Sequence, residues 1–222
     1  MLQVLILLAL MAALKYIVQL FAPVHITTPI TTPRVITSSL DEFCSLNYEW
    51  VKAKLASIRQ HGYVKSVHVA FVVGDRVVVG YDKGKRNFDF PGGNTDARIK
   101  DPVKQFLEAM FREPNEEFGI VWNAPLEWFV RDIILCGDKH KNLLVVCSVK
   151  DVPIETIRNL LHFKQTQSLT EDYLEMTDVL LTTPQLIHNP SSYVASRYHQ
   201  VVAIAKGAKY QHSFSDIAMI AY

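Results

Sequence analysis

Residues 88–120 read FDFPGGNTDARIKDPVKQFLEAMFREPNEEFGI, and the rest of the chain is interpreted around them. Near its end the stretch places Glu113, Glu116 and Glu117 at i, i+3 and i+4, a spacing that puts three carboxylates on one face of a helix. Adjacent carboxylates repel one another in water, whereas hard cations such as Mg²⁺ and Mn²⁺ prefer oxygen ligands. The pattern therefore predicts a helical face that binds a divalent cation.

Two neighbouring features support this prediction. Arg112 precedes Glu116 by one helical turn, so the two can form an i,i+4 ion pair that holds the cluster in place. Upstream, Pro91 is followed by Gly92 and Gly93, which let the backbone turn sharply and approach a metal or a phosphate closely. We expect the glycines and the carboxylates to face each other.

The stretch resembles a known family. Residues 112–120, REPNEEFGI, resemble the end of the Nudix box, GX5EX7REUXEEXGU with U apolar, and Gly92-Gly93 resembles its start. The resemblance implies an α/β fold, a Nudix-type α/β/α sandwich with a mixed β-sheet. It also implies a nucleoside-diphosphate-X hydrolase, which acts on phosphoric anhydride bonds and needs Mg²⁺ or Mn²⁺.

The resemblance assigns roles to residues of the box. Arg112, Glu113 and Glu116 are implied to be catalytic. The metal ligands that it implies are Glu113, Glu116, Glu117 and the carbonyl of Gly92. A further acidic residue from a distant loop completes many family sites, and we favour Glu175 over Glu171 and Asp172 because Glu175 opens a predicted strand.

The chain departs from the pattern in two places. Counted backward from Arg112, the box glutamate falls on Lys104, so its role is vacant or moves to Asp96, Asp101 or Glu108. A lysine can neither bind a cation nor act as a carboxylate base. The alternative function is therefore a catalytically weak Nudix-fold module that binds a nucleotide or RNA.

The second departure is Pro114, which stands where the pattern has an aliphatic residue. Proline has no N–H, so the helix loses its hydrogen bond to the carbonyl of Met110. We expect a kink there, or another turn form in the second half of the helix.

Within the family, the chain is most similar to the snoRNA-decapping and inosine-diphosphatase branch, over roughly residues 62–207. The stretches that carry this are residues 66–70, 172–175 and 189–200. The branch implies that His68 and Gln200 read the base, so the substrate is a nucleotide or a capped RNA end. His68 as a core histidine and Gln200 as a solvent-facing residue are the alternatives. Trp122, Trp128 and Tyr193 could stack on a base, but aromatic residues at strand and helix spacing belong to the core more often than to a binding site.

A basic loop, Lys83-Gly84-Lys85-Arg86, leads into the short strand that begins at Asn87. It is either a solvated turn or a phosphate contact. Arg86 and Asn87 are the candidates here for substrate binding.

Composition narrows the class of protein. The chain has 222 residues and a formal net charge of +1, with 49% hydrophobic and 20% charged residues. It can bury a sizeable core but is not a generally basic nucleic-acid binder. Its three cysteines, Cys44, Cys136 and Cys147, lack metal-ligand spacing, and Cys136 and Cys147 lie in apolar strand-like runs, which predicts buried free thiols and a reducing compartment.

The N-terminus divides into two segments. Residues 2–24 are strongly apolar, long enough to span a bilayer, and interrupted by Lys15. A membrane anchor, a cleaved signal and a packed leader stay open. As an anchor, residues 2–24 predict a membrane-associated protein with a cytosolic catalytic domain, the alternative being a soluble cytoplasmic or nuclear protein. Residues 25–38 repeat Thr-Thr-Pro and predict an extended linker.

The remaining residues, 39–222, are predicted to form the Nudix domain with an N-terminal accessory helix. The helix begins at Ser38 or Ser39, followed by Asp41 and Glu42, and continues to Gly62. Further helices are predicted from Asp101, over 151–162 and over 191–206. The predicted strands cover 64–73, 76–81, 87–90, 127–136, 142–149 and 175–182.

Overall fold

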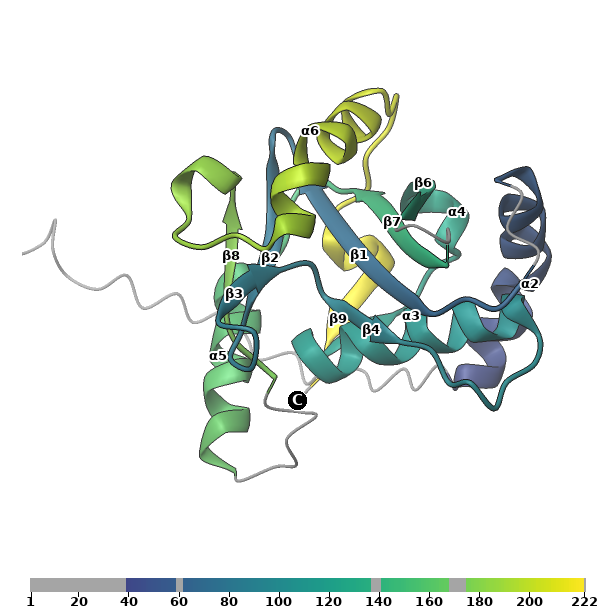
Figure 1. Cartoon of the computed structure of the whole chain (residues 1–222), viewed down its shortest axis with the longest axis horizontal. Helices are drawn as coiled ribbons and strands as arrows, with labels where there is room; N and C mark the ends of the chain where they lie inside the picture. Colours follow the sequence, from purple (N-terminus) through teal and green to yellow (C-terminus); the bar gives the residue numbers. More distant parts are fainter. Residues whose placement is uncertain (1–38, 59–61, 137–140, 168–174, 222) are drawn as a thin grey trace, which may run out of the picture. The chain divides into compact units, whose positions relative to one another are not determined.

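The computed structural model describes residues 39–58, 62–136, 141–167 and 175–221. Within them a seven-stranded mixed sheet forms the centre of the fold (Figure 1). Its strands are β1 (Ser66–Val73), β2 (Arg76–Asp82), β3 (Asn87–Asp89), β4 (Gly92–Asn94), β6 (Val130–Cys136), β7 (Asn142–Ser148) and β8 (Met176–Thr182).

The middle of the sheet is β1, which runs parallel to β7 and antiparallel to both β2 and β4. β2 pairs with the end of β1 at Val72 and Val73, whereas β4 pairs with its beginning from Ser66 to His68. β3 and β8 pair with β2, and β6 pairs with β7. β2 and β4 therefore pair with different parts of β1, and the chain between them, residues 83–91, includes β3.

Helices cover both faces of the sheet. Successive side chains of β1 point to opposite faces, so they pack into two separate cores. Val67, Val69 and Phe71 share one buried cluster with α2 (Leu40–Ser57), α3 (Pro102–Phe118) and α5 (Ile154–Thr166). Ala70 and Val72 share the other with α6 (Ser192–Lys206). The predicted α/β/α sandwich with a mixed sheet is confirmed.

The accessory helix α2 begins as its sequence predicts. Ser39 and Glu42 form a capping box, in which the Ser39 hydroxyl accepts from the backbone N–H of Glu42 and the Glu42 carboxylate accepts from that of Ser39. The helix ends at Ser57, before the predicted Gly62. It packs against α3, so the accessory helix supports the helix that carries the carboxylates.

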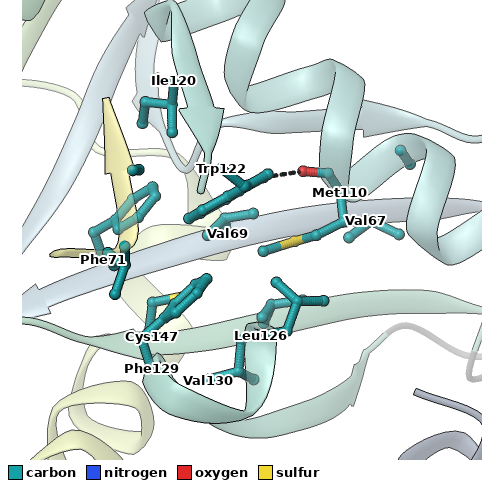
Figure 2. Close-up of a cluster of buried hydrophobic side chains, with 14 of the residues drawn as sticks. Val67, Val69, Phe71, Met110, Ile120, Trp122, Leu126, Phe129, Val130 and Cys147 are labelled. Carbon is teal, nitrogen blue, oxygen red and sulfur yellow. Dashed lines mark hydrogen bonds between the residues drawn. The ribbon is translucent and has the colours of Figure 1, made fainter. Parts of the chain in front are cut away.

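α3 stays α-helical through Pro114 to Phe118, so the expected change of turn form does not occur. The carbonyl of Met110, which Pro114 cannot bond, accepts a hydrogen bond of 2.7 Å from the indole Nε1 of Trp122 (Figure 2). Trp122 lies in β5 (Ile120–Trp122) and is 1% exposed. A side chain from the next element thus replaces the missing backbone donor.

Several elements differ from the prediction. The predicted strand from Glu127 is wrong at its start, because Leu126–Phe129 forms one helical turn, α4, before β6. That turn is held by Leu126, whose N–H donates to the side chain of the buried Asn47 at 2.8 Å. A small second sheet pairs β5 with β9 (Ala218–Ile220), and β9 follows α7 (Phe214–Ile217). A 3₁₀ turn at Pro184–Leu186 precedes α6.

The expected membrane localisation is corrected here. No helix among the described residues is long and apolar enough to span a bilayer, which overturns the expectation of a membrane-associated protein. The apolar segment 2–24 and the linker 25–38 lie outside the described residues.

Candidate active site

The ends of α3 are fixed by its sequence. Asp101 caps the first turn as predicted, its carboxylate accepting from the N–H of Val103 at 2.8 Å, and Pro102 opens the helix. Gly119 ends it in the left-handed conformation, with φ of 68°. The ammonium of Lys164, on α5, donates to the carbonyl of Glu116 at 2.8 Å and so satisfies one carbonyl of the last turn.

A cavity of about 700 Å³ lies where α3 faces β4. Glu113 and Glu117 are 7% and 3% exposed, and the Glu116 side chain is 23% exposed. All three carboxylates of the predicted metal-binding face line this one cavity. Its lining also includes Lys65, Ser66, His68, Lys85, Asp89, Gly92, Gly93, Asn94, Arg112, Asn142, Glu175 and Tyr193.

Glu117 is the most enclosed of the three carboxylates. Its Oε2 accepts a hydrogen bond of 2.7 Å from the backbone N–H of Gly92, and its buried Oε1 has no hydrogen-bond partner among the described residues. Burial raises the pKa of Glu117 well above its ordinary value, and the charge of Glu113 adds to this, although the Gly92 amide opposes it. Glu117 therefore carries an acceptor oxygen without a donor.

Glu113 lies against the second glycine. A Cβ added to Gly93 would be 2.5 Å from Oε2 of Glu113, so only glycine leaves room for the carboxylate in this position. Burial raises the pKa of Glu113 to about 7, with Arg112 opposing the shift and Glu116 contributing to it. The Gly-Gly pair thus contacts the carboxylates, as the sequence predicts, but as strand β4 rather than as a sharp turn.

Arg112 connects the cluster to β4. Its Nη1 lies 2.7 Å from Glu113 and 2.9 Å from Glu116, the second being the i,i+4 pair expected from the spacing. Its Nε lies 2.5 Å from Glu108, and its Nη2 donates to the carbonyl of Asn94 at 2.7 Å. One guanidinium thus holds three carboxylates of α3 beside the strand.

The three residues predicted as substitutes for Lys104 make different contacts. Among the three predicted substitutes, Glu108 is the one that reaches Arg112, whereas Asp96 pairs with Arg98 and Asp101 caps the helix. Lys104 is exposed and lines a separate cavity of about 380 Å³ between α2 and α3. Lys104 therefore does not face the carboxylate cluster.

The donor set fits a divalent cation in its chemistry. Carboxylate oxygens are the ligands of hard cations, and Glu117 offers a buried oxygen without a partner. Among the described residues no three acidic, histidine or cysteine side chains already converge on one point, and Arg112 contacts both Glu113 and Glu116. The cluster is thus a source of negative charge and oxygen ligands rather than a finished cage.

The cavity lining also includes an aromatic pair, His68 and Tyr193, and His68 pairs with Gly92 across β1 and β4. His68 stands edge-on to Tyr193, with ring centroids 5.3 Å apart, and its buried Nδ1 has no hydrogen-bond partner in the described parts of the chain. Burial lowers the pKa of His68, an effect that outweighs the nearby charge of Asp89. His68 is therefore neutral at pH 7 and presents an acceptor.

The predicted residues outside the box divide into two groups. Glu175 lines the cavity, 3.4 Å from the ammonium of Lys85, while Glu171 and Asp172 lie outside the described residues. Arg86, Asn87 and Gln200 do not line the cavity. Gln200 instead accepts a hydrogen bond of 3.0 Å from Arg197 on α6. The substrate-binding roles of these three residues stay predictions.

Sequence reasoning missed Asp89 and Asn142, which also line the cavity, and it named Lys85 only as part of the basic loop 83–86. Asn142 reaches it because β7 pairs in parallel with β1, opposite Ser66. Pairing between strands so far apart in sequence leaves no local signal. Asp82, the buried carboxylate that forms an ion pair with Lys85, appears in the sequence only as an ordinary acidic residue at the end of a strand.

No family model and no curated protein matches the chain. Similar solved structures include a UDP-X diphosphatase, at 14% identity and a TM-score of 0.41 over 76% of this chain and 75% of that one. A Nudix-family hydrolase from Clostridium perfringens gives 14% and 0.36, over 65% and 99% of the two chains. An ADP-ribose pyrophosphatase from Streptococcus suis gives 16% and 0.37, over 67% and 95%. Likeness at this level carries no argument about activity.

Proposed function

We propose that the chain is a Nudix-type hydrolase that cleaves a diphosphate linkage with the help of Mg²⁺ or Mn²⁺. The observation that carries the proposal is the convergence of the predicted residues. Glu113, Glu116 and Glu117 line one cavity directly beside Gly92 and Gly93, and two of these carboxylates are almost fully buried. Burial raises the pKa of both groups, and a bound cation would favour their ionised forms.

The proposed roles follow from the contacts. Glu113, Glu116 and Glu117 would hold the cation, which when bound supplies charge neutralisation of the diphosphate and a more acidic water. Arg112 orients Glu113 and Glu116 through its guanidinium. Gly92 orients Glu117 through its N–H. Glu175, which lines the same cavity, is a candidate base whose pKa burial raises above its ordinary value.

The substrate class we propose is a nucleoside diphosphate derivative or a capped RNA end. The cavity is lined both by carboxylates and by the aromatic pair His68 and Tyr193, which suits a substrate that carries both a diphosphate and a ring. Inosine diphosphate, ADP-ribose and cap-labelled RNA are therefore the substrates to test first.

The test is turnover of these three substrates by the full-length chain with Mg²⁺ or Mn²⁺. We expect hydrolysis that Glu117→Gln reduces by roughly a hundredfold or more, because this substitution removes a cation ligand without changing side-chain volume. Glu127→Gln is the matched control, since Glu127 is exposed and lies outside the cavity. Binding of these compounds without turnover would favour the weak nucleotide- or RNA-binding module instead.

A further inference from the structure

Lys85 is a cation at the edge of the cavity that the proposed function has not used. It lies in the loop between β2 and β3 and lines the cavity together with Glu117 and Glu175. Its side chain is 53% exposed, so it remains accessible to a solute in the cavity. Lys83 and Arg86, in the same loop, do not line the cavity.

A buried carboxylate fixes Lys85 in this position. The side chain of Asp82 is only 1% exposed, and its Oδ2 lies 2.5 Å from the Lys85 ammonium. Its Oδ1 accepts from the backbone N–H of Lys85 at 2.8 Å. A carboxylate buried this deeply needs a charged partner, so Asp82 holds both the loop and the ammonium.

Lys85 lines the same cavity as Glu117, Glu175 and His68, so its charge acts on all three groups. It lies 3.4 Å from Glu175, and its charge lowers the pKa both of Glu117 and of His68. Burial alone would lower the pKa of Lys85, but Asp82 and Glu175 raise it overall, so Lys85 is charged at neutral pH. An anion bound between the carboxylates and His68 would therefore meet this ammonium.

We propose that Lys85 binds the diphosphate group of the substrate and that Asp82 is its positioning residue. The inference rests on the proposed function for the identity of the ligand. The Lys85 ammonium carries three N–H donors and forms ion pairs with Asp82 at 2.5 Å and Glu175 at 3.4 Å, and its half-exposed side chain leaves room for a phosphate oxygen as well. A compact point charge suits this contact, because it stabilises a phosphate without fixing its orientation.

The alternative is that the ion pair between Lys85 and Glu175 only connects the loop to the start of β8. This alternative predicts a different result. Lys83 already provides a backbone link, since its N–H donates to the carbonyl of Glu175 at 3.0 Å. If the Lys85 contacts were structural alone, their loss would lower the melting temperature and leave the affinity for a diphosphate unchanged.

The experiment measures binding of α,β-methylene-ADP, whose P–C–P bridge resists hydrolysis, to the full-length chain with Mg²⁺ by calorimetry. We expect Lys85→Met to weaken binding roughly tenfold or more and to reduce its salt dependence. Lys85→Arg should stay within about threefold of wild type, because the charge remains. Lys83→Met is the matched control, since the substitution keeps the backbone N–H.

Lys85→Met leaves Asp82 buried without its cation and can unfold the loop. The double variant Asp82→Asn with Lys85→Met removes both charges, and an asparagine oxygen can still accept from the backbone N–H. We expect it to fold and to bind as weakly as Lys85→Met. Asp82→Asn alone should weaken binding less than either, because the ammonium is present but no longer held in place.

Wild-type affinity in the double variant would overturn the inference, as would a wild-type chain that does not bind the analogue. Turnover of the three substrates is a separate measurement, and it shows whether the proposed function itself fails. Lys85-dependent binding without hydrolysis of any of the three substrates would support the inference and refute the hydrolase. Hydrolysis that depends on Glu117 but not on Lys85 would do the reverse.

Discussion

Gly93 contacts Glu113 in a way that separates activity from stability. The atoms that an added Cβ would meet belong to the Glu113 carboxylate, the free end of a flexible side chain. We therefore expect Gly93→Ala to move the carboxylate and to reduce turnover by about a hundredfold. The melting temperature should change by no more than about 2 °C. Turnover assays and thermal melts of the same preparation measure both quantities.

Gly92→Ala is the comparison for that experiment. Gly92 has φ of 144°, and its added Cβ would lie 2.3 Å from the carbonyl oxygen of Val67, which is backbone and cannot move away. We expect this variant to lose about 2–3 kcal/mol of unfolding free energy. Equal effects of the two alanines on stability would contradict the proposed contact between Gly93 and Glu113.

The raised pKa of Glu113 predicts how stability depends on pH without metal. Glu113 has a folded pKa of about 7 against an ordinary value of 4.5, mainly because of burial. Between these values the folded state binds more protons than the unfolded state, so the free energy of unfolding falls as pH rises through this window. Urea denaturation in EDTA at pH 5 and pH 7.5 measures the fall.

Two variants and the addition of Mg²⁺ test whether Glu113 causes this pH dependence. Glu113→Gln should reduce the fall, whereas Glu127→Gln should keep it. Mg²⁺ should restore stability at the higher pH, since a cation favours the ionised carboxylates of the folded state. The same pH dependence in Glu113→Gln as in wild type would show that another group is responsible.

At the scale of elements, Pro114 and Trp122 form a pair that a double-mutant cycle can test. Trp122→Phe leaves the buried carbonyl of Met110 without its 2.7 Å hydrogen bond, in addition to the loss of packing. We expect a loss of about 2–4 kcal/mol of unfolding free energy. Pro114→Ala restores a backbone N–H that can bond the same carbonyl.

In the double variant we therefore expect part of that loss to be recovered, with a coupling energy of about 1 kcal/mol. Urea denaturation of the wild type, both single variants and the double variant measures it. Strictly additive effects would show that Trp122 does not replace the donor that Pro114 lacks.

The helix ends and the Pro114 site together show what local sequence patterns can and cannot predict. The capping residues Ser39 and Asp101, and Pro102 after the latter, placed two helix starts correctly because caps act within one turn. Of the two effects expected of Pro114, the change of turn form does not occur, and the donor that replaces its missing N–H comes from β5. The strand predicted from Glu127 failed for the same reason, since Asn47 on α2 holds that turn.

At the scale of the whole molecule, the carboxylate face of the site was readable from helical spacing alone. Glu113, Glu116 and Glu117 lie together because one helix carries them, and Gly92 and Gly93 face them as expected. Asn142 was not found, because the parallel pairing of β7 with β1 brings it to the cavity, and Lys85 was named only as part of the basic loop 83–86. Arg86, Asn87 and Gln200 were inferred from resemblance, and they do not line this cavity.

The central claim is that the carboxylates of α3 hold a divalent cation beside Gly92 and Gly93. Electron paramagnetic resonance of Mn²⁺ added to the full-length chain tests it most directly, because free and bound ions give different signals. We predict saturable binding at millimolar supply or below, retained in Glu127→Gln and weakened at least tenfold, or about 1.4 kcal/mol, in Glu113→Gln with Glu117→Gln. A wild-type chain that leaves millimolar Mn²⁺ free, or a double variant that binds it equally well, would contradict the account.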